Sequence, residues 1–274
     1  MTPGPGRFVA IGDSFTEGVG DPHADLPNGV RGWADRVAER LAKHEPGWQY
    51  ANLAVRSKRL RHIVADQLPV ALAMEPTLIT VYAGGNDILD VGADVTELLV
   101  SYQRMIRDLA ATGATLVLFT GYDIPVHPAA RVFLRRNHLY NDAVRRIARE
   151  VGAVLIDYWG FEAYADKRMW SPDRLHMSKR GHKYLAARVL DALEVPHGIE
   201  AALRDPLEAR SPRQWFRDQH RWYVDWVLPL VGRKLRRITL GDSLSARWPT
   251  LVTVPRKGGL RRLARDLHAA PEEP

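Results

Sequence analysis

The sequence predicts an α/β protein in which a parallel five-stranded sheet lies between two layers of helices. Short apolar segments, each long enough for one strand, alternate with longer segments of helical periodicity through the first 195 residues. Such alternation is typical of a parallel sheet that is buried on both faces. With 274 residues the chain is long enough to bury a full core, and neither repeats nor low-complexity tracts interrupt the pattern.

The predicted strands are short, rich in aliphatic and β-branched residues, and followed by turn or polar residues. The first strand runs directly into Gly12, and the third ends at Gly84-Gly85. A continuous apolar run bounded by turn residues indicates a strand covered on both faces. In chain order the five segments are Phe8–Ile11, Trp48–Ala54, Thr77–Ala83, Thr115–Thr120 and Val154–Asp157.

The predicted helices place apolar residues three or four positions apart. Trp33, Val37 and Leu41 follow the first strand at this spacing, with charged residues between them. Ser178 stands at the start of the last helix, where a serine side chain is a favourable N-cap. The remaining helical segments are Ile63–Ala73, Val95–Ala111, Arg131–Val151 and Ser178–Leu193.

The net charge of +7 lies mostly in the C-terminal part of the chain. Residues 196–274 hold 15 Lys and Arg against 9 Asp and Glu, so residues 1–195 are nearly neutral. This distribution argues against nucleic acid as a partner of the main domain. It leaves only weak association of the basic C-terminal region with an anionic surface.

The chain has no cysteine, which excludes disulfides and thiolate metal sites. The opening residues MTPGPGRFVA lack an apolar stretch behind a basic start, so we expect no signal peptide. No run of about 18 apolar residues occurs, so we expect no membrane span. Together these features predict a cytoplasmic protein.

We divide the chain into a domain of residues 1–195 and a basic, Trp-rich extension of residues 196–274. Within Gln214–Leu230, the residues Trp215, Trp222 and Trp226 share one face at helical spacing. One interpretation is that this mainly helical extension packs its aromatic side chains on the first domain. The other is a lid or a membrane-surface segment, favoured by the basic run Arg233–Arg237.

The stretch Arg7–Gly18 carries the main functional signal. A strand that ends in Gly12 and leads through Asp13 to Ser14 places a hydroxyl at the carboxyl edge of the sheet, where open α/β sheets bind ligands. A helix that begins there offers free N–H groups and its positive dipole end to a developing oxyanion. The alternative is that Asp13 or Ser14 is only an N-cap.

Three more segments stand where this architecture would place a site. The second strand leads into Asn52–Ser57, the third ends in Gly84–Asp87, and Asp173–His176 precedes the last helix. Each segment alone has a simple explanation as a turn, or as a surface histidine. Separate turns do not explain why all of them occur together in this order.

These blocks resemble those of the SGNH hydrolases, also called the GDSL esterase/lipase family, over residues 7–193. Ser14 matches the nucleophile block, although Phe15 replaces the leucine of the family name. Asn86 lies in a Gly-x-Asn-Asp block and His176 in an Asp-x-x-His block. Ser57 occupies the position of a glycine whose amide is an oxyanion donor. The resemblance implies a flavodoxin-like three-layer fold and ester hydrolysis.

The residue types fit serine catalysis. Neutral His176 can take the proton of the Ser14 hydroxyl, and Asp173 can orient the imidazole ring. From the resemblance, the oxyanion would be bound by the amides of Ser14 and Ser57 and by the side chain of Asn86. No Gly-x-Ser-x-Gly occurs, which argues against an α/β-hydrolase.

We expect a small-molecule ester as substrate, and neither a metal nor a cofactor. The six-residue spacing of His176 and His182 fits no common metal-ligand pattern, and no phosphate-binding glycine motif occurs. The alternative function is a binding module for an acylated or carbohydrate ligand that has lost turnover. The serine at position 57 is the main support for that alternative.

A literal GDSL string occurs at Gly241–Leu244, far from the first strand. The residues after Ser243 contain neither a Gly-x-Asn-Asp nor an Asp-x-x-His block, and Trp248-Pro249 leaves little room for a following helix. We therefore predict that Ser243 is a turn residue and that Ser14 is the nucleophile.

Overall fold

The computed structural model describes residues 6–90, 92–123, 131–200, 211–229 and 241–269. These residues form a six-stranded sheet with the order β5-β4-β3-β1-β2-β6, in which only β6 is antiparallel to its neighbour. The strands are β1 (Arg7–Gly12), β2 (Gln49–Asn52), β3 (Leu78–Tyr82), β4 (Thr115–Phe119), β5 (Val154–Ile156) and β6 (Trp248–Thr253). The predicted α/β fold with a mostly parallel sheet is confirmed.

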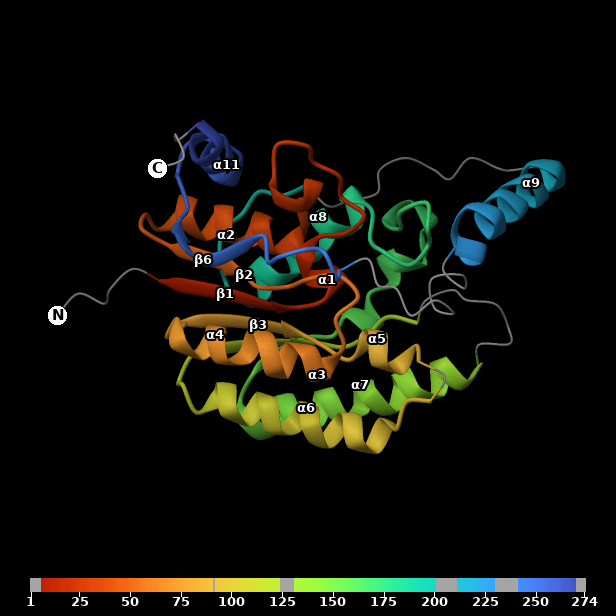
Figure 1. Ribbon diagram of the computed structural model, residues 1–274, viewed down its shortest axis with the longest axis horizontal. Helices are drawn as coiled ribbons and strands as arrows, with labels where there is room; N and C mark the ends of the chain where they lie inside the picture. Colours follow the sequence, from red (N-terminus) through yellow and green to blue (C-terminus); the bar gives the residue numbers. More distant parts are fainter. Residues whose placement is uncertain (1–5, 91, 124–130, 201–210, 230–240, 270–274) are drawn as a thin grey trace.

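Helices cover both faces of this sheet (Figure 1). One face is covered by α2 (Gly32–His44), α8 (Lys179–Ala192) and α11 (Gly259–Ala269). The other is covered by α3 (Leu60–His62), α4 (Leu68–Ala73), α6 (Val95–Ala110) and α7 (Arg131–Val151). A π-helical turn joins α3 to α4, and Ser178 caps α8 as predicted. Each face has its own apolar core, so the central strands are buried on both sides.

The strand order places a crevice beside the end of β1. The chain moves from β1 to β2 on one side, then returns to β3 on the other side of β1. The helices that follow β1 and β3 therefore lie on opposite faces of the sheet. Such a change of direction opens a ligand crevice at the carboxyl edge, between these two strands. Two short helices begin there, α1 (Ser14–Glu17) after β1 and α5 (Gly85–Ile88) after β3.

The sixth strand was not predicted. β6 pairs with β2 at the edge of the sheet, with Gln49 opposite Thr253 and Asn52 opposite Trp248. Only Trp248 in this strand is fully buried, so no apolar run marks it in the sequence. Pro249 lacks a backbone N–H, which an edge strand tolerates and a central strand does not. The prediction therefore gives the five parallel strands but omits this antiparallel edge strand.

The C-terminal residues lie in two different places. Residues 241–269 contribute β6 to the sheet and α11 to the layer of α2, where Leu260 is completely buried. By contrast, α9 (Pro212–Trp222) extends away from the sheet (Figure 1). In the π-helical turn that continues α9, Trp226 is exposed. The basic run Arg233–Arg237 falls outside the described residues.

Gly241–Ser243 forms a turn and Ser243 is exposed, as predicted. Gly241 lies so close to the second loop that a Cβ there would come within 2.0 Å of the Arg56 carbonyl oxygen. Among the described residues, no helix combines the length and the apolar character that crossing a bilayer would require.

Candidate active site

Ser14 stands at the first position of α1, directly after β1. Gly12 makes this turn possible because its φ is 151° and a Cβ there would lie 2.5 Å from the carbonyl oxygen of Tyr82 on β3. The Asp13 side chain caps α1 by accepting the N–H of Phe15 at 3.0 Å. Ser14 therefore presents its hydroxyl at the carboxyl edge of the sheet.

The structure brings Ser14, His176 and Asp173 into one hydrogen-bonded chain. His176 Nε2 lies 3.0 Å from Ser14 Oγ, and His176 Nδ1 lies 2.6 Å from Asp173 Oδ2. With Nδ1 protonated, the imidazole donates to Asp173 and its Nε2 can accept the Ser14 proton. This is the arrangement in which a histidine activates a serine hydroxyl.

Asp173 is held as a carboxylate. Burial raises its pKa, but hydrogen bonding and attraction to His176 outweigh burial and lower the pKa to about 2. Its Oδ1 accepts the N–H groups of Leu175 and His176 at 2.9 and 3.0 Å and the hydroxyl of Ser171. The loop from Ser171 to His176 thus folds around the Asp173 carboxylate, which faces the His176 ring.

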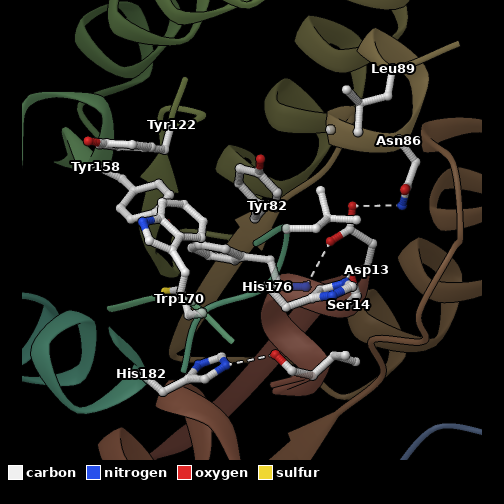
Figure 2. Close-up of a pocket in the computed structure, with 15 residues that line it drawn as sticks. Asp13, Ser14, Tyr82, Asn86, Leu89, Tyr122, Tyr158, Trp170, His176 and His182 are labelled. Carbon is white, nitrogen blue, oxygen red and sulfur yellow. Dashed lines mark hydrogen bonds between the residues drawn. The ribbon is translucent and has the colours of Figure 1, made fainter. Parts of the chain in front are cut away.

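Asn86 links three of the predicted blocks. Its side-chain Nδ2 donates to Asp13 Oδ2 at 3.1 Å (Figure 2) and also to the Lys58 carbonyl oxygen at 3.0 Å. Both of its N–H groups are thus engaged in this structure. Asp87 has a structural role, because its carboxylate accepts the N–H of Leu60 at 2.9 Å.

Asp13 is a buried carboxyl group beside Ser14. Burial raises its pKa to about 7, although the N–H of Phe15 and the nearby His176 favour the charged form. Burial thus disfavours the charged form of this carboxyl. Its hydrogen bonds with Phe15 and Asn86 link the start of α1 to the segment that follows β3.

Ser57 has a left-handed backbone conformation with φ of 65°. Glycine adopts this region freely, whereas a residue with a Cβ does so at a cost. The serine therefore keeps the conformation that suits a glycine at this position. The neighbouring Lys58 carbonyl accepts from Asn86, which fixes the Ser57 loop next to the α5 block.

We expect Ser57→Gly to keep or raise kcat and to raise the free energy of unfolding by up to about 1 kcal/mol. The reason is that the left-handed strain disappears while the backbone amide remains. Ser57→Ala should be nearly silent in kcat. Steady-state kinetics and urea unfolding measure both effects. A hundredfold loss of kcat in Ser57→Ala would show that the hydroxyl itself is used.

Glu17 is a site-supporting residue that the sequence analysis missed. It is completely buried at the end of α1 and pairs with the Arg56 guanidinium at 2.7 Å. The same carboxylate accepts the backbone N–H of Arg56 at 2.6 Å. This ion pair links α1, which begins at Ser14, to the residue before Ser57. The two residues are 39 positions apart, so neither spacing nor periodicity indicates the contact.

The site opens into a cavity of about 70 Å³. Its lining includes Ser14, Asn86 and His176, whereas Ser57 and Asp173 do not line it. Figure 2 shows Ser14 and His176 facing a group of aromatic side chains across the cavity. These are Phe15, Tyr82, Tyr122, Tyr158 and Trp170. The chemistry at Ser14 would therefore take place beside a largely apolar wall.

His182 also lines the cavity, but it is completely buried and bonded to the carbonyl oxygen of Val19 at 3.0 Å. Burial lowers its pKa to about 4, so it is neutral at physiological pH. Within the described part of the chain, no three His, Asp or Glu side chains are grouped as metal ligands would be.

The chain is similar in sequence to a known family and to two plant proteins. The model of the GDSL-like lipase/acylhydrolase family matches residues 10–184. GDSL esterase/lipase CPRD49 of Arabidopsis thaliana is 25% identical over 211 residues, which cover 68% of this chain and 79% of that protein. GDSL esterase/lipase WDL1 of Oryza sativa subsp. japonica is 24% identical, and the match covers 71% and 80% of the two chains.

Solved structures share the fold at low sequence identity. TesA is 20% identical with a TM-score of 0.57, and the match covers 69% of this chain and 98% of TesA. Axe2, an acetylxylan esterase from Geobacillus stearothermophilus, is 20% identical with a TM-score of 0.56. That match covers 77% of this chain and all of Axe2. These likenesses establish the α/β architecture that carries the site.

Proposed function

The chain belongs to the GDSL-like lipase/acylhydrolase family, and we propose that it is a serine esterase whose nucleophile is Ser14. Membership of this family makes it a hydrolase of ester bonds. The observation that carries the finer proposal is the hydrogen-bonded chain from Ser14 through His176 to Asp173. Its two distances, 3.0 and 2.6 Å, are those of a base in contact with both its nucleophile and its orienting carboxylate.

In the proposed first step, His176 Nε2 takes the Ser14 proton as Oγ attacks the carbonyl carbon of the ester. The tetrahedral intermediate then expels the alcohol, which receives that proton from Nε2, and an acyl group remains on Oγ. Water attacks the acyl-enzyme in the same way, again with Nε2 as base. Asp173 stays ionised throughout, since its pKa is about 2, and it stabilises the imidazolium ion.

In the proposed mechanism, the negative oxygen of the intermediate accepts hydrogen bonds from the backbone amides of Ser14 and Ser57 and from the side chain of Asn86. Each donor in such a site contributes about 3–4 kcal/mol of transition-state stabilisation. Because Asn86 donates to Asp13 and Lys58 in the free protein, its contribution requires one of these bonds to be shared or exchanged.

The size and lining of the cavity favour a small acyl group. A cavity of about 150 Å³ accommodates benzene. The cavity here is about 70 Å³, which suits an acyl chain of a few carbons. Hydrolysis of p-nitrophenyl acetate and butyrate by the purified protein tests the proposal, with release of p-nitrophenol as the readout. Binding of these esters without turnover would instead support the binding-module alternative.

The second prediction concerns pH. We expect kcat/KM to fall on the acid side, because a protonated His176 cannot accept the Ser14 proton and because Asp13, with a pKa of about 7, gains a proton there as well. Asp173 should add no further acid limb above about pH 4, because its pKa is held near 2. His176→Ala should abolish turnover and leave the circular dichroism spectrum unchanged. A folded and active His176→Ala protein would remove this histidine from the mechanism.

A further inference from the structure

Helix α9 contacts the loop that carries Asp173 and His176. The Trp222 indole N–H donates to the main-chain carbonyl oxygen of Asp173 at 2.9 Å. One turn earlier on α9, the side-chain oxygen of Gln219 accepts from the Arg174 guanidinium at 2.7 Å. The same guanidinium stacks on Trp222, 4.7 Å from the ring centre. The family model matches residues 10–184, so α9 lies outside the matched residues.

Arg174, which α9 contacts, has a strained backbone. Arg174 has φ of 57°, in the left-handed region where a residue with a Cβ is disfavoured. It lies between Asp173 and His176, so its conformation sets how the carboxylate faces the imidazole. A conformation of this kind persists only where surrounding contacts hold it. The contacts from α9 act on the Arg174 side chain and on the carbonyl group just before it.

We propose that Trp222 and Gln219 are positioning residues for the catalytic loop, which they hold in the conformation that joins Asp173 to His176. The inference rests on the proposed function of that pair. Anchoring the Asp173 carbonyl fixes the direction in which its carboxylate leaves the backbone. Without the Trp222 bond, the loop can relax at Arg174, and the Asp173 carboxylate then moves away from His176 Nδ1. The imidazole is consequently less well oriented toward Ser14.

The role differs from that of a lid or a packing helix. A lid would act on substrate binding and so on KM, whereas a positioning residue acts on the chemical step and so on kcat. Trp226 offers a matched control on the same segment. Its ring is 41% exposed, and no hydrogen bond among the described residues joins it to the loop 171–178.

The test uses full-length protein and p-nitrophenyl acetate. We expect Trp222→Leu to lower kcat by about 10- to 100-fold with KM nearly unchanged, since small misplacements of catalytic groups have effects of this size. Trp222→Phe, which keeps the ring and loses the N–H, and Gln219→Ala should lie between Trp222→Leu and wild type. Trp226→Leu should stay within about twofold of wild type, as for exposed sites away from the loop.

A rescue experiment separates positioning from general support of the fold. Glycine adopts the left-handed region freely, so in an Arg174→Gly background the loop no longer needs α9 to hold it. The loss of kcat caused by Trp222→Leu should therefore shrink to less than about threefold in that background. If Trp222→Leu fails to fold, Trp222→Phe provides the same comparison, because the bond that it loses goes to the Asp173 main-chain carbonyl and does not involve the Arg174 side chain.

The inference is wrong if the Trp222 and Gln219 variants keep the kcat of wild type. It is also wrong if Trp226→Leu loses as much as Trp222→Leu, or if the loss is equally large in the Arg174→Gly background. Ser14→Ala serves as the reference for the proposed function. If Ser14→Ala is as active as wild type, the assignment of the nucleophile fails. If Ser14→Ala is inactive and Trp222→Leu is fully active, only the role of α9 fails.

Discussion

Replacing Ser14 with Ala is expected to lower kcat/KM for p-nitrophenyl acetate by about 10⁴-fold or more, the scale of loss when a serine nucleophile is removed. The physical reason is that no other oxygen lies within hydrogen-bond distance of His176 Nε2 among the described contacts. The acyl-enzyme then cannot form, and only the residual effect of substrate binding and oxyanion stabilisation remains.

Ser243→Ala is the matched control for this result, because Ser243 lies in the literal GDSL string. It should keep activity within about twofold, the usual outcome for an exposed turn residue. Loss of activity in Ser243→Ala, with full activity in Ser14→Ala, would reverse the assignment of the nucleophile.

Replacing Arg247 with Leu is expected to lower the free energy of unfolding by about 3–5 kcal/mol, because it leaves a buried carboxylate without its partner. The Arg247 and Asp35 side chains are both completely buried and lie 2.6 Å apart. Arg247 also donates to the carbonyl oxygens of Glu17 and Arg31 at 3.0 and 2.9 Å. It therefore anchors the start of β6 to the end of the nucleophile helix.

The control is Arg261→Leu, which removes a solvent-exposed ion pair with Asp25. The two side chains are 57% and 39% exposed, so the change should cost less than about 1 kcal/mol. Urea unfolding monitored by tryptophan fluorescence compares the variants. Equal stability of Arg247→Leu and Arg261→Leu would contradict the assigned role of the buried pair.

The loss of unfolding free energy in Arg247→Leu should also depend on pH. Burial already raises the pKa of Asp35, although Arg247 opposes the rise, so removing Arg247 raises the pKa further. A carboxyl whose pKa is higher in the folded state than in the unfolded state destabilises the fold as pH rises between the two values. Arg247→Leu should therefore be less destabilised at about pH 5 than at about pH 8.

The sequence predicts the five parallel strands because their apolar runs reflect burial on both faces. The same criterion fails for β6, where Trp248 is buried and the following residues face solvent in part. Periodicity also places the bounds of α7 at Arg131–Val151 as observed. It gives the bounds of β2 least well, with Trp48–Ala54 predicted and Gln49–Asn52 observed, because a propensity pattern does not show where ladder hydrogen bonds stop.

The four motif blocks predict Ser14, Asn86, Asp173 and His176 because each motif is local in sequence. The supporting pairs Glu17–Arg56 and Arg247–Asp35 are separated by 39 and 212 positions. A pair of opposite charges that far apart gives no signal in a single sequence. The left-handed conformation of Ser57, in contrast, could be anticipated, since its position is one that the family fills with glycine.

The most direct test of the account is to identify the residue that a fluorophosphonate modifies in the wild-type protein. This reagent forms a stable bond to an activated serine oxygen, so peptide mass spectrometry reports which serine His176 activates. We predict modification of Ser14 alone, and none in the His176→Ala protein. Modification of Ser243, or of Ser14 to the same extent without His176, would contradict it.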